Sequence, residues 1–301
     1  MISFLQRISL LFVILTVAVA SCTERIDIPK IGDAPVHIVI YGYITSDTVQ
    51  HSINITRSAG YFSSDSPEGV SDAIVTITDS DGKIISFAEN DTVPGLYQTP
   101  EDYGEMGKFY TLNVHVDIDG TPAHYQSDRV YLQPIHNIDS ISLRRAPPPM
   151  PRHLVELRLW AENFAEDNTY TIFVKINDSI VNSSINRFMV ISDAMFIGTY
   201  IAGVGCYYLN QREQEHRNER LNIGDTVTLN MNAISKEYAA FIDNVRSEIR
   251  GSNPIFGGPP ANVPTNIRRI SANGYPALGF FTAFPSRYSS TIVKEDFTYI
   301  D

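Results

Sequence analysis

The chain is poor in cysteine, in positive charge and, after its first residues, in long apolar runs. Only 2 of its 301 residues are Cys, which excludes a framework of several disulfides. Lys and Arg number 23 against 34 Asp and Glu, a formal net charge of −11, so the basic surface of a nucleic-acid-binding protein is absent. A hydrophobic content of 43% is typical of a folded, globular protein. Stability must therefore come from packing.

Catalytic and metal-binding motifs are also missing from the sequence. It contains no His-Glu-x-x-His, no Gly-x-Ser-x-Gly and no cysteine pair with zinc spacing. The turn at residues 79–82 is too short for a calcium loop. Cys206 lies in an apolar, strand-like run, where a cysteine usually acts as a small hydrophobe and not as a nucleophile. We therefore expect no cofactor, no metal and no enzymatic activity. A hydrolase that uses paired carboxylates remains the open alternative, because sequence does not say which carboxylates meet in space.

What the N-terminus does contain is a complete export signal. Arg7 precedes an apolar stretch, and small residues follow it up to Cys22. This order predicts a secretory signal peptide over residues 1–21. A Cys directly after the small residues resembles a bacterial lipobox, which implies that Cys22 is lipidated and that residues 22–34 form a tether to the membrane. The alternative is an ordinary signal peptide whose cleavage site happens to lie beside a cysteine.

The first hundred mature residues show the alternation of apolar and polar residues that predicts strands. Residues 74–78 and 84–87 flank an Asp-Gly turn, and residues 110–116 run into the turn Asp119-Gly120. Asp-Gly between apolar runs predicts a hairpin, because glycine accepts a positive φ at little cost. Short strands without intervening helices favour an antiparallel β-sandwich, which we place at residues 35–134.

A second β-rich domain is predicted over residues 135–301 and contains one helix. Apolar residues at helical spacing predict this amphipathic helix near residues 235–250, covering an open sheet face. Residues 277–284 and 290–293 are expected to form a strand pair. The predicted fold is thus all-β, with two immunoglobulin-like β-sandwich domains and one amphipathic helix in the second.

Several runs of the mature chain resemble an uncharacterised family. They are residues 22–28, 71–79, 224–229, 253–256, 259–267 and 277–281, with Ser192, Asp193, Phe196 and Gly198. The family is "domain of unknown function forty-two forty-nine" of Bacteroidota lipoproteins. The resemblance implies an outer-membrane lipoprotein, often encoded near a TonB-dependent receptor. It implies no reaction and no catalytic residues.

A short pattern, Asp followed by Ser or Thr and an aliphatic residue, recurs along the chain. It resembles the O-glycosylation motif of Bacteroidota, and turns that precede strands give the same pattern without a glycan. The predicted acceptors are Thr48, Thr92, Ser140, Ser179 and Thr226.

A set of C-terminal aromatic residues is suited either to stacking on a sugar or peptide ligand or to the core. Its members are Tyr275, Phe280, Phe281, Phe284 and Tyr288.

Together these features predict a lipid-anchored accessory or ligand-binding protein of the outer membrane. The expected partner is a TonB-dependent nutrient-uptake receptor, because the family resemblance implies one. A structural envelope protein is the second alternative beside the hydrolase. The sequence leaves open whether the protein faces the periplasm or the cell surface, and it predicts no specific ligand.

Overall fold

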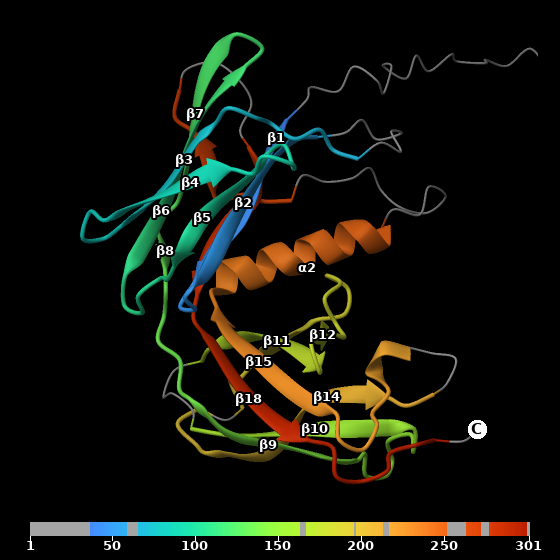
Figure 1. Cartoon of the computed structure of the whole chain (residues 1–301). Helices are drawn as coiled ribbons and strands as arrows, with labels where there is room; N and C mark the ends of the chain where they lie inside the picture. Colours follow the sequence, from blue (N-terminus) through green and yellow to red (C-terminus); the bar gives the residue numbers. More distant parts are fainter. Residues whose placement is uncertain are drawn as a thin grey trace, which may run out of the picture. The chain divides into compact units, whose positions relative to one another are not determined.

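The computed structural model describes residues 37–58, 66–162, 167–195, 197–212, 217–251, 263–271 and 277–299. These residues form β-strands joined by turns, together with a single α-helix (Figure 1). The predicted all-β class with one helix is confirmed. No helix of the described part of the chain is long and apolar enough to cross a membrane.

Ten strands form the first sheet, in the order β16-β7-β6-β3-β4-β5-β2-β1-β17 with β8 paired to β6. Apolar side chains alternate into one buried cluster, which draws on strands from both ends of this order, so the sheet encloses a single core. The strands are β1 (Ile38–Thr45), β2 (Val49–Arg57), β3 (Ile74–Asp79), β4 (Ile84–Glu89), β5 (Leu96–Asp102), β6 (Phe109–Ile118), β7 (Thr121–Ser127), β8 (Val130–Tyr131), β16 (Ile267–Arg269) and β17 (Leu278–Phe284).

Both predicted Asp-Gly hairpins are present in this sheet. β3 pairs antiparallel with β4, and Gly82 takes a φ of 87° in the turn between them. β6 pairs with β7 through Asp119 and Gly120, whose φ angles are 54° and 81°. Two consecutive positive φ values match the twist of the flanking strands, which is why this local sequence sets the register.

The expected pairing of residues 277–284 with residues 290–293 is wrong. β17 instead pairs in parallel with β1, while β18 (Ser286–Ile292) pairs with β15 in another sheet. Pro285 stands between β17 and β18 and has no N–H for a ladder, and the chain passes there from one sheet to the other. The boundary at residue 134 stays a prediction, while two C-terminal strands, β16 and β17, belong to the first sheet.

The remaining strands form two facing sheets, β14-β10-β9 and β12-β11-β15-β18, with β13 paired to β11. One buried cluster contains residues of both sheets, including Leu157 of β10 and Ile172 of β11, so they form a sandwich. The elements are β9 (Ile138–Arg145), β10 (Leu154–Ala161), β11 (Thr169–Ile176), β12 (Ser179–Ile180), β13 (Met189–Ser192), β14 (Ile201–Asn210), the 3-10 helix η2 (Arg217–Glu219) and β15 (Thr226–Ile234).

The helix α2 spans Lys236–Gly251, as predicted from its apolar spacing. Ser235 caps it, because its Oγ accepts the N–H of Tyr238 at 3.1 Å. Tyr238, Phe241 and Ile242 pack against Phe280 and Phe284 of β17 and Tyr41 of β1. The buried face is shorter than the sequence pattern, since Ile249 is exposed. The helix therefore covers the first sheet at its β17 edge.

Candidate functional site

Four segments of the chain gather at one end of the first sheet. β1, β3 and β5 run in the same direction, because each is antiparallel to a shared neighbour, and β17 is parallel to β1. The residues that follow these four strands therefore lie at the same end. We call this surface the loop end and define it as residues 46–48, 80–83, 103–108 and 285–288, together with the side chains they contact.

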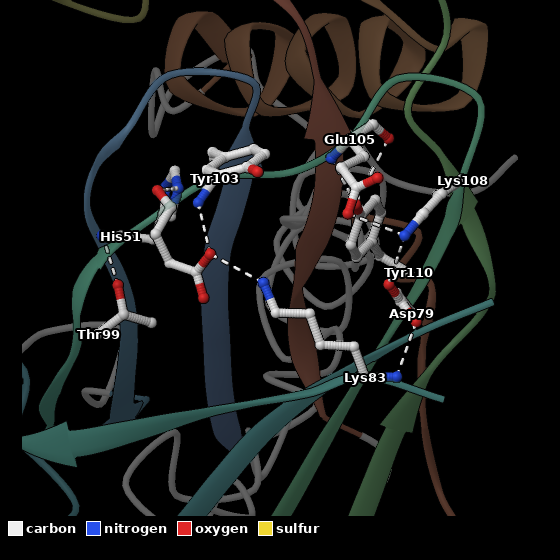
Figure 2. A network of polar contacts seen from close by, with 9 residues as sticks. His51, Asp79, Lys83, Thr99, Tyr103, Glu105, Lys108 and Tyr110 are labelled. Atoms are coloured by element: carbon white, nitrogen blue, oxygen red, sulfur yellow. Dashed lines mark hydrogen bonds and ion pairs between the residues drawn. The ribbon is translucent and has the colours of Figure 1, made fainter. Parts of the chain in front are cut away.

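A lysine holds three carboxylates together in the loop end, and Figure 2 draws it with two of them, Asp79 and Glu105. Lys108 Nζ lies 3.2 Å from Asp79 Oδ2, 3.0 Å from Asp81 Oδ2 and 2.8 Å from Glu105 Oε1. Asp79 is buried, and its Oδ1 accepts the N–H groups of Asp81 at 2.9 Å and Lys83 at 2.8 Å. Burial alone would raise the pKa of Asp79, but these N–H groups and the ammonium lower it below its usual value. The β3–β4 turn is thus tied to the β5–β6 loop.

A second polar group ties the end of β5 to β2 and to the β3–β4 turn. Asp102 Oδ1 accepts Lys83 Nζ at 3.0 Å and the N–H of Tyr103 at 2.8 Å. The imidazole of His51 is buried, and its Nε2 lies 3.0 Å from the carbonyl oxygen of Asp102, so Nε2 carries the hydrogen. The N–H of His51 donates to Thr99 Oγ1 at 3.0 Å (Figure 2). Desolvation lowers the pKa of His51, against the opposing effects of Asp102 and Asp47.

The same end exposes large side chains that a folded protein usually covers. Tyr43 is 40% exposed, Tyr103 47%, Met106 42% and Tyr288 49%. They come from β1, the β5–β6 loop and β18. The N–H of Gly104 in the β5–β6 loop donates to the carbonyl oxygen of Thr45 at 2.7 Å, and the hydroxyl of Tyr288 donates to Asp47 Oδ2 at 2.5 Å, which brings these segments together. Tyr and Met are enriched at binding surfaces because they offer apolar area with little entropy loss or with adaptable shape. The loop end thus combines rigid loops with exposed aromatic and thioether groups.

The five predicted glycan acceptors lie apart from one another. Thr48 is in the loop end, whereas Thr92 lies in the β4–β5 turn at the opposite end of the sheet. Ser140 lies in β9, Ser179 begins β12 and Thr226 begins β15. The first four are exposed and Thr226 is half-buried. Cys22, the predicted lipidation site, lies outside the described residues.

Cys206 and most of the predicted aromatic set belong to the interior. The thiol of Cys206 is buried and donates to the carbonyl oxygen of Leu157 at 3.4 Å, and burial raises its pKa to about 12. Phe280, Phe281 and Phe284 are buried in the two clusters that β17 joins. Tyr275 lies outside the described residues, which leaves Tyr288 as the exposed member of the set.

A small cavity between the two facing sheets contains two carboxylates. Its volume is about 60 Å³, and Glu162 and Asp193 line it with mostly apolar residues. Asp193 accepts the N–H of Asn168 at 2.7 Å and the hydroxyl of Tyr170 at 3.0 Å, while Glu162 is exposed. Ligand sites are usually about 300–1,000 Å³, so this space suits water better than a substrate.

A larger hollow of about 360 Å³ lies where β8 and β17 meet the start of α2. Charged groups of both signs line it, namely Asp128, Arg129, Lys236 and Glu237.

The sequence points to Thr48, Tyr288 and the 79–82 turn of the loop end, but not to its ion-paired and buried polar groups. The Asp79–Gly82 turn was recognised as a hairpin, but Lys108 and His51 carry no motif. These residues come from separate segments of the chain, and only the order and direction of the strands in the sheet bring residues 51, 79, 102 and 108 together. Among the described residues, no group of three or more His, Cys, Asp or Glu side chains is placed to hold a metal ion.

Comparison with known proteins places the chain in a family. A search of the curated proteins finds no match. One family model, described as a domain of unknown function, matches residues 24–289. The match includes every strand of the first sheet and both facing sheets up to Ser289 of β18. The chain therefore belongs to the family Domain of unknown function (DUF4249), as the resemblance predicted.

Proposed function

We propose that the protein is a lipid-anchored binding component of the outer membrane that works beside a TonB-dependent receptor. The observation that carries this proposal is the loop end, where ion pairs hold the loops and four large side chains remain exposed. Loops held before binding lose less conformational entropy when a partner docks. Binding, and not catalysis, is the role that such a surface serves.

The lipid anchor at Cys22 supports the same proposal. Two proteins confined to one membrane meet at a high effective concentration, so a weak interface is sufficient for association. A net charge of −11 directs the chain away from nucleic acid and from anionic lipid. The anchor then supplies the attachment that charge does not. Replacing Cys22 by Ala should release the protein into the soluble periplasmic fraction, and unchanged recovery with membranes would contradict lipidation.

Affinity purification from native membranes tests the receptor partnership. The tagged protein should enrich a TonB-dependent receptor over an untagged strain, and the double variant Tyr43→Ser/Tyr288→Ser should lose that enrichment. Ile74→Ser is the matched control, because Ile74 is 66% exposed but begins β3 at the opposite end of the sheet. If no receptor is enriched by the wild-type protein, the uptake role fails and a structural envelope role takes its place.

The hydrolase alternative has its own test. It would have to use the carboxylates of the small cavity, and Asp193 is the buried one. Turnover of a polysaccharide or peptide substrate by the wild-type protein, abolished in Asp193→Asn with the fold retained, would replace the binding proposal. We expect no turnover, because both oxygens of Asp193 already accept hydrogen bonds within the protein.

A further inference from the structure

A hollow outside the loop end lies beside the connection between β9 and β10, and we call it the β9–β10 hollow. Its volume is about 520 Å³, within the range of about 300–1,000 Å³ that is usual for ligand sites. The lining residues are Arg145, Ala146, Pro148, Met150, Arg152 and Tyr299. Two of them are arginines and none is acidic, although the chain carries a net charge of −11.

Arg152 lines this hollow without a partner of opposite charge. Its side chain is exposed, and it forms no hydrogen bond or ion pair with the residues that the structure describes. All of its N–H donors are therefore available to a ligand. A single exposed arginine of this kind needs no explanation, because water solvates it. The presence of a second guanidinium group in the same hollow is what makes the arrangement informative.

The second arginine, Arg145, is held in place by the C-terminal segment. Its Nη2 donates to the carbonyl oxygens of Asp296 at 2.9 Å and Thr298 at 3.4 Å, and its guanidinium lies 5.8 Å from the centroid of the Phe297 ring. These contacts leave the hydrogens of Nη1 and Nε for a ligand. Hydrogen bonds from Thr298 lower the pKa of Asp296, with a smaller contribution from Arg145, but none of the ion pairs between described residues joins these two side chains.

Two unpaired arginines in one hollow are unlike other arginines of this chain. Arg144, next to Arg145, lies 2.5 Å from the carboxylate of Glu156, and Arg57 lies 2.9 Å from that of Asp119. Like charges repel, and an acidic chain has carboxylates enough to pair them. A hollow lined by charge of one sign concentrates ions of the opposite sign. The β9–β10 hollow is therefore suited to an anion.

A phosphoryl group satisfies two guanidinium groups better than a carboxylate does. A phosphomonoester carries a charge of about −1.5 to −2 at pH 7 and offers three strong acceptor oxygens, whereas a carboxylate carries one charge on two oxygens. Guanidinium groups are well matched to phosphate. Inorganic phosphate alone would leave most of the hollow empty. Pro148, Met150 and Tyr299 offer apolar and aromatic surface for an organic group.

We propose that the β9–β10 hollow binds a phosphomonoester. Arg145 and Arg152 hold its phosphoryl group, while Pro148, Met150 and Tyr299 contact its organic part. The site lies outside the loop end, so this proposal goes beyond the proposed function and does not depend on a receptor.

Calorimetry on the detergent-solubilised full mature lipoprotein tests the site. The probes are phenyl phosphate, neutral phenyl β-glucoside, citrate and dihexanoyl phosphatidic acid. Phenyl phosphate should bind, and Arg152→Met should weaken its binding by at least about tenfold, because a charge-assisted contact is lost. This variant should keep its fold, since Arg152 has no hydrogen bond or ion pair to lose among the described residues. Arg129→Met is the matched control and should leave the affinity unchanged. It removes the same charge from an exposed arginine whose guanidinium lies 4.6 Å from the centroid of the Phe109 ring, in the first sheet.

Each other outcome decides the proposal. An absence of phenyl phosphate binding, or binding that Arg152→Met leaves unchanged, would overturn it. Equal affinity for phenyl β-glucoside would overturn it as well, because the phosphoryl group would then not be recognised. Tighter binding of citrate with the same dependence on Arg152 would assign the hollow to polycarboxylates instead.

The phosphatidic acid probe identifies the source of the phosphomonoester. Arginine-dependent binding that is tighter than that of phenyl phosphate would support the site and point to a lipid headgroup. The reverse order would support it and point to a soluble compound. All of these measurements are made without a receptor, so their failure would leave the proposed function of the loop end in place.

Discussion

The backbone N–H of Ser286 donates a hydrogen bond to Ser46 Oγ at 3.0 Å, across 240 positions of the sequence. This bond lies where β1 and β17 end side by side, with Thr45 opposite Phe284. It holds the β1–β2 turn to the point at which the chain leaves the first sheet for β18. Residues 46–48 and 285–288 of the loop end follow directly on the two strands. Their spacing is therefore set by a sheet and not by a free loop.

Removing the buried carboxylate of Asp79 should destabilise the loop end. Asp79→Ala leaves the N–H groups of Asp81 and Lys83 without their acceptor and Lys108 without its buried partner. We expect the free energy of unfolding to fall by about 1–3 kcal/mol in urea titrations. Asp81→Ala is the control, because the side chain of Asp81 is 68% exposed and its loss should change little. Equal effects of the two variants would contradict the proposed role of Asp79.

Stability should fall between pH 7 and pH 5 because of His51. Its folded-state pKa is lowered from 6.5 by burial, so below pH 6.5 the unfolded chain binds a proton that the folded chain does not. The stabilising effect of the neutral imidazole is complete above pH 6.5 and is lost as the pH falls, at up to about 1.4 kcal/mol per pH unit. Carboxylates with lowered pKa values, such as Asp79 and Asp225, act below pH 4 and lie outside this window.

Urea unfolding at pH 7.5 and pH 5.5 measures this loss. His51→Gln, which keeps a side-chain donor for the carbonyl oxygen of Asp102, should reduce it. The burial of His124 also lowers its pKa, so part of the loss should remain in the His51 variant. A wild-type stability that is flat over this range, or a variant with an unchanged slope, would show that the neutral imidazole of His51 is not linked to folding.

Gly203→Ala should disturb the outer face of β10. A Cβ at Gly203 would overlap the side chains of Arg158 and Trp160, and the residue has a φ of +68°. We expect a loss of about 1–3 kcal/mol from backbone strain and displaced side chains. Trp160 is the single tryptophan of the chain, so a shift of its emission reports the displacement directly. Gly120→Ala is the matched control, because Gly120 has a φ of +81° but open space around its Cβ position, and it should destabilise without moving the emission.

The parts of the fold that sequence predicted are those set by local chemistry. The Asp119-Gly120 turn and the apolar face of α2 depend on residues a few positions apart. The parallel pairing of β1 with β17 joins residues some 240 positions apart. The sequence of an apolar run does not show which strand it pairs with. The prediction therefore paired two runs that are neighbours in the sequence. The candidate site escaped prediction for the same reason. Lys108 and Asp79 stand 29 positions apart, and only the strand order brings them into contact.

Glycan occupancy should follow exposure among the five predicted acceptors. Thr48, Thr92, Ser140 and Ser179 are exposed, whereas Thr226 is half-buried at the start of β15. The N–H of Thr226 also donates to Asn177 Oδ1 at 3.0 Å, which fixes the backbone at that site. A glycosyltransferase needs an accessible hydroxyl, so glycopeptide mass spectrometry of the native protein should find modification among the first four and none at Thr226. Modification of Thr226 alone would contradict exposure as the deciding property.

Cys206 should react with thiol reagents only when the protein opens. Burial raises its pKa to about 12, so at pH 7 only about one thiol in a hundred thousand is the reactive thiolate. Cys22→Ser leaves Cys206 as the single cysteine, which makes the labelling unambiguous. We expect labelling of the folded variant to be slow and to accelerate by orders of magnitude in urea as the facing sheets separate. Rapid labelling of the folded protein at pH 7 would place an accessible thiolate between β10 and β14 and would revive a nucleophilic role for this residue.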